Sequence, residues 1–182
     1  MRLKNEQYEE IKRAVIDTFI EYDIKCVPIN AFEMAVKMGL MVIPYSALTK
    51  EQLVSSNKFS QDGFSMEMEN NDWKIYYNDM CQNYGRINQT IMHEIGHYVL
   101  GHIKEGKEEE AEAKFFAKYA LAPPPLIHNI CDDVNPFALM NKFEISYEAA
   151  QYACDYYQHW MDFGEPDYTQ YERKMLELFH VA

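Results

Sequence analysis

The 182-residue sequence lacks several features, and each absence excludes a class of protein. It has no long apolar run and no positively charged segment followed by an apolar one, so we expect neither a membrane span nor a secretory leader. Its four cysteines lie far apart without a C-x-x-C pair, which argues against a disulfide framework and against a thiolate zinc site. We therefore expect a cytoplasmic protein with reduced thiols.

Basic residues are also scarce. Lysine and arginine number 17 against 29 aspartates and glutamates, and the net charge of −12 argues against direct binding to a nucleic-acid backbone. Internal repeats, low-complexity segments and a glycine-rich phosphate loop are absent as well. The hydrophobic content of 48% and the length together predict one globular domain, residues 1–182, with a sizeable core.

The most informative stretch is the H-E-x-x-H segment His93–His97. On a helix, residues i and i+4 lie on one face, so both imidazoles can point at a single ion. Glu94 lies away from that axis but can still reach a water at the ion. Two imidazoles, an open coordination position and a nearby base are the working parts of a zinc hydrolase.

The surroundings predict that this segment is helical, from about Gln89 to Leu100. Asn88 is the expected N-cap, and Gly101 is the expected glycine after the last turn. Apolar residues recur at helical spacing on the side away from the histidines: Ile91, Ile95, Tyr98 and Val99. This agreement favours a metal site over two core histidines that happen to lie four residues apart.

Two histidines do not complete a zinc site, and the expected third ligand is Glu112, in a helix predicted from Lys107 to Leu121. Glu112 falls within the apolar stripe of this helix, where an unpaired carboxylate is costly and a metal would remove the cost. Glu108, one turn earlier, is the substitute. The other glutamates of the run are interpreted as a solvated face favoured by the helix dipole: Glu105, Glu109 and Glu110.

His102 is a weaker ligand candidate. A metzincin reads H-E-x-x-H-x-x-G-x-x-H, which would require glycine and histidine where this sequence has Leu100 and Ile103. On a continuing helix His102 also falls on the side opposite His93. We interpret His102 as a structural residue that follows the helix, with a supporting role beside the metal ligands as the alternative.

Two segments of the chain resemble the ImmA/IrrE-type metallopeptidases. Arg86–His102 is similar to their R-x-N-x-T-I-x-H-E-x-G-H-x-x-L-G-H, and Glu112–Pro123 is similar to E-A-x-x-F-A-x-x-L-L-x-P. Ala120 stands where a second leucine is usual, and Lys114 where asparagine or aspartate is common. These departures concern packing and leave the ligand positions intact.

The resemblance implies one catalytic Zn²⁺ ion, bound by His93, His97 and Glu112, with Glu94 as the catalytic base. Members of this family are intracellular proteases of phages, mobile elements and stress regulation. They cleave helix-turn-helix repressors and thereby relieve repression. The resemblance therefore implies a protein substrate of that kind for this chain.

The remaining pattern predicts a mainly helical, zincin-like α+β fold, with a small antiparallel sheet of about three strands packed on the metal-site helices. The expected units are an N-terminal helix–strand unit at 5–45, a hairpin at 63–78, the metal helices at 89–121 and C-terminal helices at 124–179. The hairpin is expected to turn at Asn70–Asp72, and a late helix to end near Phe163–Gly164.

The second hairpin strand, Trp73–Asn78, is the candidate edge strand for holding an extended peptide, with an ordinary sheet strand as the alternative. Tyr76 and Tyr77 on it are candidates for substrate contact. The same two tyrosines, His102 and His128 are all candidates for the oxyanion donor.

Three classes of function remain open: a peptidase, a zinc hydrolase acting on a non-peptide substrate, and an antitoxin-like binding module with a non-catalytic metal site. Glu94 argues against the third class, because a structural zinc site needs no base. An accessible strand edge beside the metal would favour the peptidase, whereas a closed pocket would favour the hydrolase of small molecules.

Overall fold

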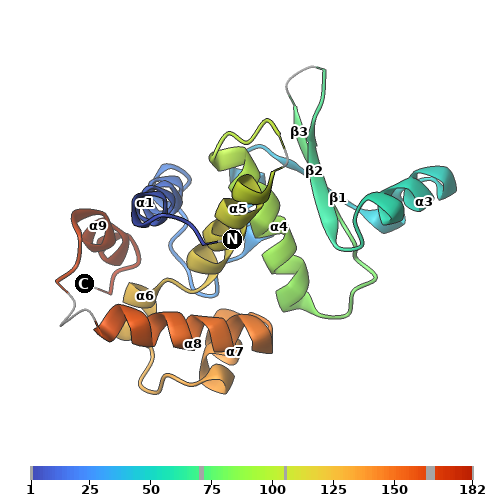
Figure 1. Ribbon diagram of the computed structural model, residues 1–182. Coiled ribbons are helices and arrows are strands. Elements are labelled where there is room, and N and C mark those ends of the chain that lie inside the picture. The colour runs from blue at the N-terminus through green and yellow to red at the C-terminus, as the bar shows by residue number, and fades with distance from the viewer. Residues whose placement is uncertain (1, 70–71, 105, 163–166, 182) are drawn as a thin grey trace.

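The computed structural model describes residues 2–69, 72–104, 106–162 and 167–181. Within these ranges the chain is a mainly helical α+β fold with one three-stranded sheet, which confirms the predicted fold class (Figure 1). The first two residues of the expected turn at Asn70–Asp72, the acidic Glu105 and the expected helix end at Phe163–Gly164 lie outside the described residues. No described helix is long and apolar enough to cross a membrane.

The elements follow one another along the chain with short connections. They are α1 (Asn5–Glu21), α2 (Ala31–Lys37), β1 (Met41–Pro44), the 3₁₀ turn η1 (Tyr45–Ala47), α3 (Lys50–Phe59), β2 (Gly63–Glu67), β3 (Trp73–Tyr77), α4 (Tyr84–Val99), α5 (Lys107–Leu121), α6 (Pro124–Ile130), α7 (Pro136–Phe143), α8 (Tyr147–Asp162) and α9 (Gln170–Leu178).

The sheet has the strand order β1-β3-β2 and is mixed, not wholly antiparallel as expected. β2 and β3 form the predicted antiparallel hairpin, whereas β1 runs parallel to β3. Parallel strands need a crossover, which η1, α3 and β2 supply here. The prediction that Trp73–Asn78 is an edge strand is wrong, because β3 pairs on both sides. Among the described residues β2 pairs with β3 alone and forms an edge of the sheet.

The centre of the molecule is the packing of α5 between α4 and α1 (Figure 1). Gly96 of α4 lies directly against Phe116 of α5, and a Cβ added at Gly96 would come within 3.1 Å of that ring. This close approach needs a residue without a side chain on α4. It brings the H-E-x-x-H segment next to the first turns of α5.

Helix α4 starts earlier than the sequence predicted. Asn83 is its N-cap, and its side-chain oxygen accepts the Arg86 N–H at 3.1 Å. The expected cap, Asn88, is a buried residue inside the helix: its amide accepts the Ala31 N–H at 2.7 Å and donates to the Ile29 carbonyl at 2.9 Å. Asn88 thus ties α4 to the start of α2. Beyond the other end of the helix, Gly101 adopts the predicted left-handed conformation, with φ +68°.

Candidate metal centre

The two motif histidines face each other from consecutive turns of α4. Their Nε2 atoms are 3.1 Å apart, and the ring centroids are 4.8 Å apart. On the opposite side of the helix Ile91 and Ile95 are fully buried in the core. The apolar face therefore anchors the helix, and the spacing of four residues places both imidazoles at one point, as predicted.

A carboxylate from α5 completes this group. The Glu110 oxygens lie 3.2 Å from His97 Nε2 and 3.5 Å from His93 Nε2. One ligand atom from each of the three residues lies within 4.8 Å of the other two, an arrangement that could hold a metal ion. Two imidazole nitrogens and one carboxylate oxygen are a ligand set typical of catalytic zinc sites, which keep a fourth position open.

The structure departs from the prediction that Glu112 faces the two histidines. Residues 110 and 112 are roughly 200° apart around a helix, so the two carboxylates point to different neighbours. Glu112 instead contacts His102 Nε2 at 3.0 Å and accepts a hydrogen bond from Gln7 at 2.8 Å. These partners satisfy the half-buried carboxylate without a metal. Glu108, the expected substitute, accepts from the same Gln7 amide at 2.8 Å.

Glu110 was missed because it lies on the side of α5 that the sequence marks as wet. Glu110, Lys114 and Ala117 share that side and line the cleft beside the histidines. A cleft is solvated, so the helix face that lines it is as polar as a face on the outer surface. Hydrophobic periodicity therefore cannot distinguish a cleft-lining face from an outer face. The only sequence signal for the position of Glu110 is that it lies about two helical turns before Ala117, on the same side of α5.

A residue of the sheet contacts the motif glutamate, Glu94. Glu94 is buried, and its Oε2 accepts a hydrogen bond of 2.6 Å from the Ser65 hydroxyl of β2. Ser65 was not predicted as a site residue. Its one signal is the alternation of β2, which places Phe64 and Met66 on one face and Ser65 on the other.

The environment of the pair keeps His93 neutral. Burial, followed by the neighbouring ring of His97, lowers the pKa of His93 below its ordinary value, and the opposing effect of Glu110 is smaller. Neutral imidazole is the form that binds a metal ion.

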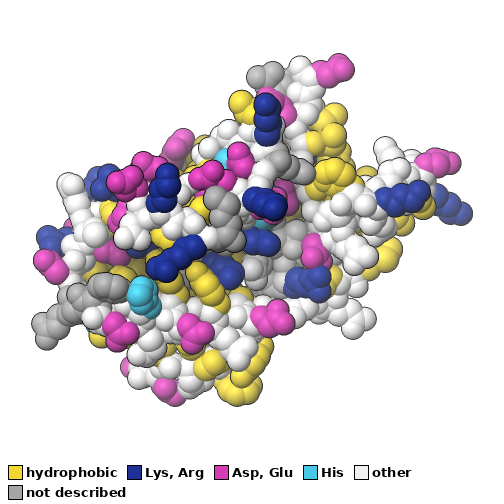
Figure 2. Space-filling model, in the orientation of Figure 1, with side chains coloured by type: hydrophobic (Ala, Val, Ile, Leu, Met, Phe, Trp, Pro, Cys, Tyr) yellow, Lys and Arg dark blue, Asp and Glu magenta, His cyan; other side chains and the backbone are white. Residues whose placement is uncertain are grey.

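A cleft of about 1330 Å³ runs past these side chains between β2, α4 and α5. Its lining carries both signs of charge: Arg86, Lys104 and Lys114, with Asp62, Glu67, Glu110 and Glu148. On the face drawn in Figure 2, acidic and basic side chains are likewise interspersed. The cleft therefore does not present a field of one sign to a ligand.

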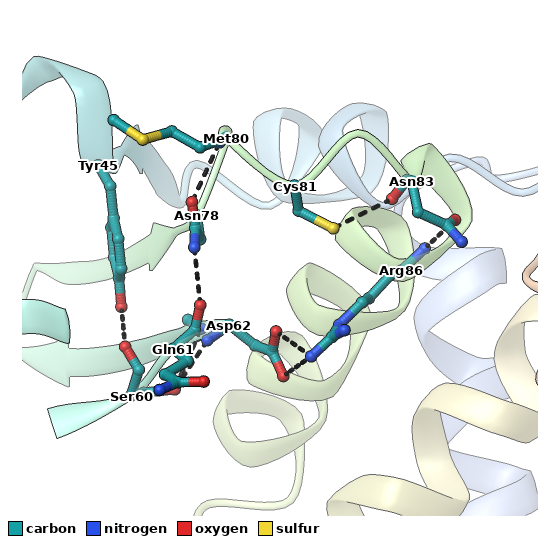
Figure 3. A network of polar contacts seen from close by, with 10 residues as sticks. Tyr45, Ser60, Gln61, Asp62, Asn78, Met80, Cys81, Asn83 and Arg86 are labelled. Carbon is teal, nitrogen blue, oxygen red and sulfur yellow. Dashed lines mark hydrogen bonds and ion pairs between the residues drawn. The ribbon is translucent and has the colours of Figure 1, made fainter. Parts of the chain in front are cut away.

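The segment that leads into β2 is fixed on both sides, as Figure 3 shows. Asp62 forms an ion pair with Arg86 of α4 at 2.7 Å. Tyr45 donates to the Ser60 carbonyl at 3.0 Å, and Asn78 donates to the Gln61 carbonyl at 2.9 Å. These bonds hold the edge strand β2 in place beside the motif helix.

Three of the predicted substrate-contact and oxyanion residues do not line this cleft. Tyr76 stacks on Phe64 with the ring centroids 4.9 Å apart, and Tyr77 packs edge-on against Phe32. His128 makes a 3.0 Å hydrogen bond with the hydroxyl of Tyr157. Among the described residues, His102 is the one predicted oxyanion candidate that lines the cleft.

Residues 54–155 match the family model Peptidase M78, described as an IrrE N-terminal-like domain. No curated protein matches the chain. The matched segment runs from α3 into α8 and contains both histidines of the motif, Glu94, and Glu110. It covers more than half of the 182 residues and agrees with the resemblance carried by the two motif segments. The chain therefore belongs to the Peptidase M78 family of metallopeptidases, which contain an IrrE N-terminal-like domain.

Proposed function

We propose that this protein is a zinc-dependent endopeptidase whose metal is held by His93, His97 and Glu110. One observation carries the proposal: two imidazoles and a carboxylate converge at one point of an open cleft, and the buried Glu94 lies next in sequence to one of them. The donor set fits zinc, because borderline-soft Zn²⁺ accepts both nitrogen and carboxylate ligands. A zinc ion bound there would supply a Lewis acid that polarises the scissile carbonyl and activates a water.

Glu94 is the general base in this proposal. Its carboxylate accepts the proton of the attacking water and then delivers a proton to the leaving amine. Ser65 fixes the orientation of that carboxylate through the 2.6 Å hydrogen bond. Glu94 also argues against an antitoxin-like module with a non-catalytic site, since such a module has no use for a base.

The shape of the cleft favours a peptide over a small molecule. Its volume of about 1330 Å³ exceeds the range of roughly 300–1,000 Å³ typical of small-molecule pockets. One wall is the edge strand β2, whose residues Gly63–Glu67 all line the cleft. An extended peptide can pair with such an edge through backbone hydrogen bonds. We propose β2, in place of the expected Trp73–Asn78, as the strand that aligns the substrate.

For the substrate we propose a helix-turn-helix transcriptional repressor of a phage or mobile element, met in the cytoplasm. Support comes from the family resemblance of the segments around the histidines and Glu112. Cleavage of such a repressor would relieve repression of the genes that it controls. A zinc hydrolase acting on a non-peptide substrate is the alternative, and the open strand edge speaks against it.

The decisive experiment incubates the zinc-loaded protein with a helix-turn-helix transcriptional repressor. We expect discrete fragments from the wild type and none from the Glu94→Gln variant or in the presence of a chelator, with mass spectrometry locating the scissile bond. If zinc binds but neither this regulator nor an unbiased peptide library is cut, the endopeptidase proposal fails. If no zinc binds, the metal site itself is wrong.

A further inference from the structure

A continuous line of polar contacts leads from the N-terminal helix to the metal centre. His97 Nδ1 lies 2.9 Å from His102 Nδ1, and His102 Nε2 lies 3.0 Å from Glu112 Oε2. The other Glu112 oxygen accepts a 2.8 Å hydrogen bond from the Gln7 side chain of α1. The line thus joins α1, α5, the segment after α4 and one of the motif histidines.

With Glu112 ionised and His102 neutral, the chemistry of these groups assigns a direction to each hydrogen bond. An ionised carboxylate can only accept, so His102 donates from Nε2 to Glu112. In a neutral imidazole the other nitrogen then accepts, so His102 Nδ1 takes the proton of His97 Nδ1. This leaves His97 Nε2 without a hydrogen, and Nε2 is the atom that faces His93 and Glu110.

Gln7 is itself oriented by its own helix. Its Oε1 accepts the backbone N–H of Lys4 at 3.0 Å, so its amide nitrogen points away and donates to Glu108 and Glu112. The neighbouring Tyr8 packs edge-on against Phe115 of α5, with centroids 4.6 Å apart. Helix α1 is therefore docked firmly where it touches Glu112.

We propose that His102, Glu112 and Gln7 are positioning residues that hold the His97 ring for metal binding, so that α1 contributes to the metal affinity of the site. The inference rests on the proposed metal site. It goes beyond that site because α1 lies outside the family-matched segment 54–155. Outer partners of a metal-binding histidine orient its ring and raise its basicity, and their loss weakens metal affinity.

The test measures zinc affinity directly, by competition with a chromophoric chelator, in the full-length protein. The variants are His102→Leu, Glu112→Gln and Gln7→Leu. Glu108→Gln is the matched control, because Glu108 lies on the same helix and accepts from the same Gln7 amide without contacting His102. We expect His102→Leu and Glu112→Gln to bind zinc ~10–100-fold more weakly. Gln7→Leu should show a smaller loss, and Glu108→Gln should keep the wild-type affinity. A Gln7→Leu variant with the affinity of Glu108→Gln would overturn the role of α1.

Two further measurements separate positioning from a purely structural role. The thermal midpoint of each metal-free variant reports folding, and the absorption spectrum of the Co²⁺-substituted protein reports ligand geometry. We expect altered Co²⁺ spectra for His102→Leu and Glu112→Gln. We also expect the double variant to bind zinc no more weakly than the weaker-binding single variant. Should His102→Leu fail to fold, His102→Phe, which keeps a ring but has no donor or acceptor, replaces it in the same measurements.

The outcomes distinguish this inference from the proposed function. A wild-type protein that binds no zinc overturns both. A wild type that binds zinc, with His102 and Glu112 variants matching Glu108→Gln in affinity and spectrum, overturns the positioning role and leaves the metal site intact. Losses that add in the double variant would show that the two residues act separately, which also overturns their joint positioning of the His97 ring.

Discussion

The Ser65 hydroxyl donates a 2.6 Å hydrogen bond to the Glu94 carboxylate, joining the edge strand β2 to the motif helix α4. The strand proposed to align the substrate thus also orients the proposed base. The loop before β2 is in turn tied to α4 by the Asp62–Arg86 ion pair. In the proposed function, substrate alignment and proton transfer therefore depend on the same wall of the cleft.

Replacement of Ser65 by alanine is expected to lower kcat while leaving zinc content unchanged. A hydrogen bond to a charged group contributes ~1.5–3 kcal/mol, so we expect a loss of roughly 10–100-fold in the chemical step. Steady-state cleavage assays and metal analysis provide the measurement. Ser55→Ala is the control, because its hydroxyl bonds only the Glu51 carbonyl on an exposed helix. An unchanged kcat in Ser65→Ala would show that the hydrogen bond does not orient the base.

Glu94→Gln is expected to keep the metal and abolish cleavage. The amide has nearly the same shape but cannot accept the proton of the attacking water, and general-base catalysis contributes typically 10²–10⁴-fold. Cleavage rates and zinc stoichiometry are measured on the same preparation. Full proteolysis by this variant would remove Glu94 as the base.

Glu110→Ala is expected to lose zinc, because it removes the only carboxylate that the described residues place at both motif histidines. Metal analysis after dialysis against buffered zinc gives the stoichiometry. Glu109→Ala, a neighbouring glutamate outside that group, is the control and should retain one zinc per chain. If Glu110→Ala keeps its zinc and Glu112→Ala loses it completely, Glu112 is the ligand, as the sequence indicated.

Asn88→Ala is expected to destabilise the fold without a direct effect on the metal ligands. The substitution leaves the buried Ala31 N–H and Ile29 carbonyl without their side-chain partner. An unsatisfied buried group costs ~1–3 kcal/mol, so for two such groups we expect a fall of about 2–6 kcal/mol in the free energy of unfolding. Urea denaturation measures it. Asn57→Ala, whose amide bonds a carbonyl within its own exposed helix, should change stability far less.

Local patterns in the sequence were sufficient for the parts of the site that belong to one helix. The spacing of His93 and His97, the buried face with Ile91 and Ile95, and Gly101 after the last turn all follow from the geometry of α4. The antiparallel pairing of β2 and β3 likewise agrees with the alternation of apolar and polar residues in the sequence. The mainly helical α+β class was predicted for the same reason.

Features that depend on two elements meeting were predicted less well. Asparagine is a common helix cap, but α2 lies so close to Asn88 that its buried side chain bonds the first residue of α2 instead. β3 was expected at the sheet edge, but β1 returns alongside it and leaves that place to β2. The partner of Asn88 and the order of the strands both depend on contacts between segments far apart in the sequence. Local sequence patterns therefore do not predict them.

The sequence by itself determined the motif helix, its two histidines and the adjacent glutamate, because helical periodicity is a property of neighbouring residues. Only the tertiary structure decided that Glu110 and not Glu112 meets the histidines, that Ser65 reaches Glu94, and that Gln7 reaches Glu112. The reason is that α5 packs against α4 on one side and α1 on the other. Which of its polar side chains faces which partner depends on that packing, which hydrophobic periodicity does not encode.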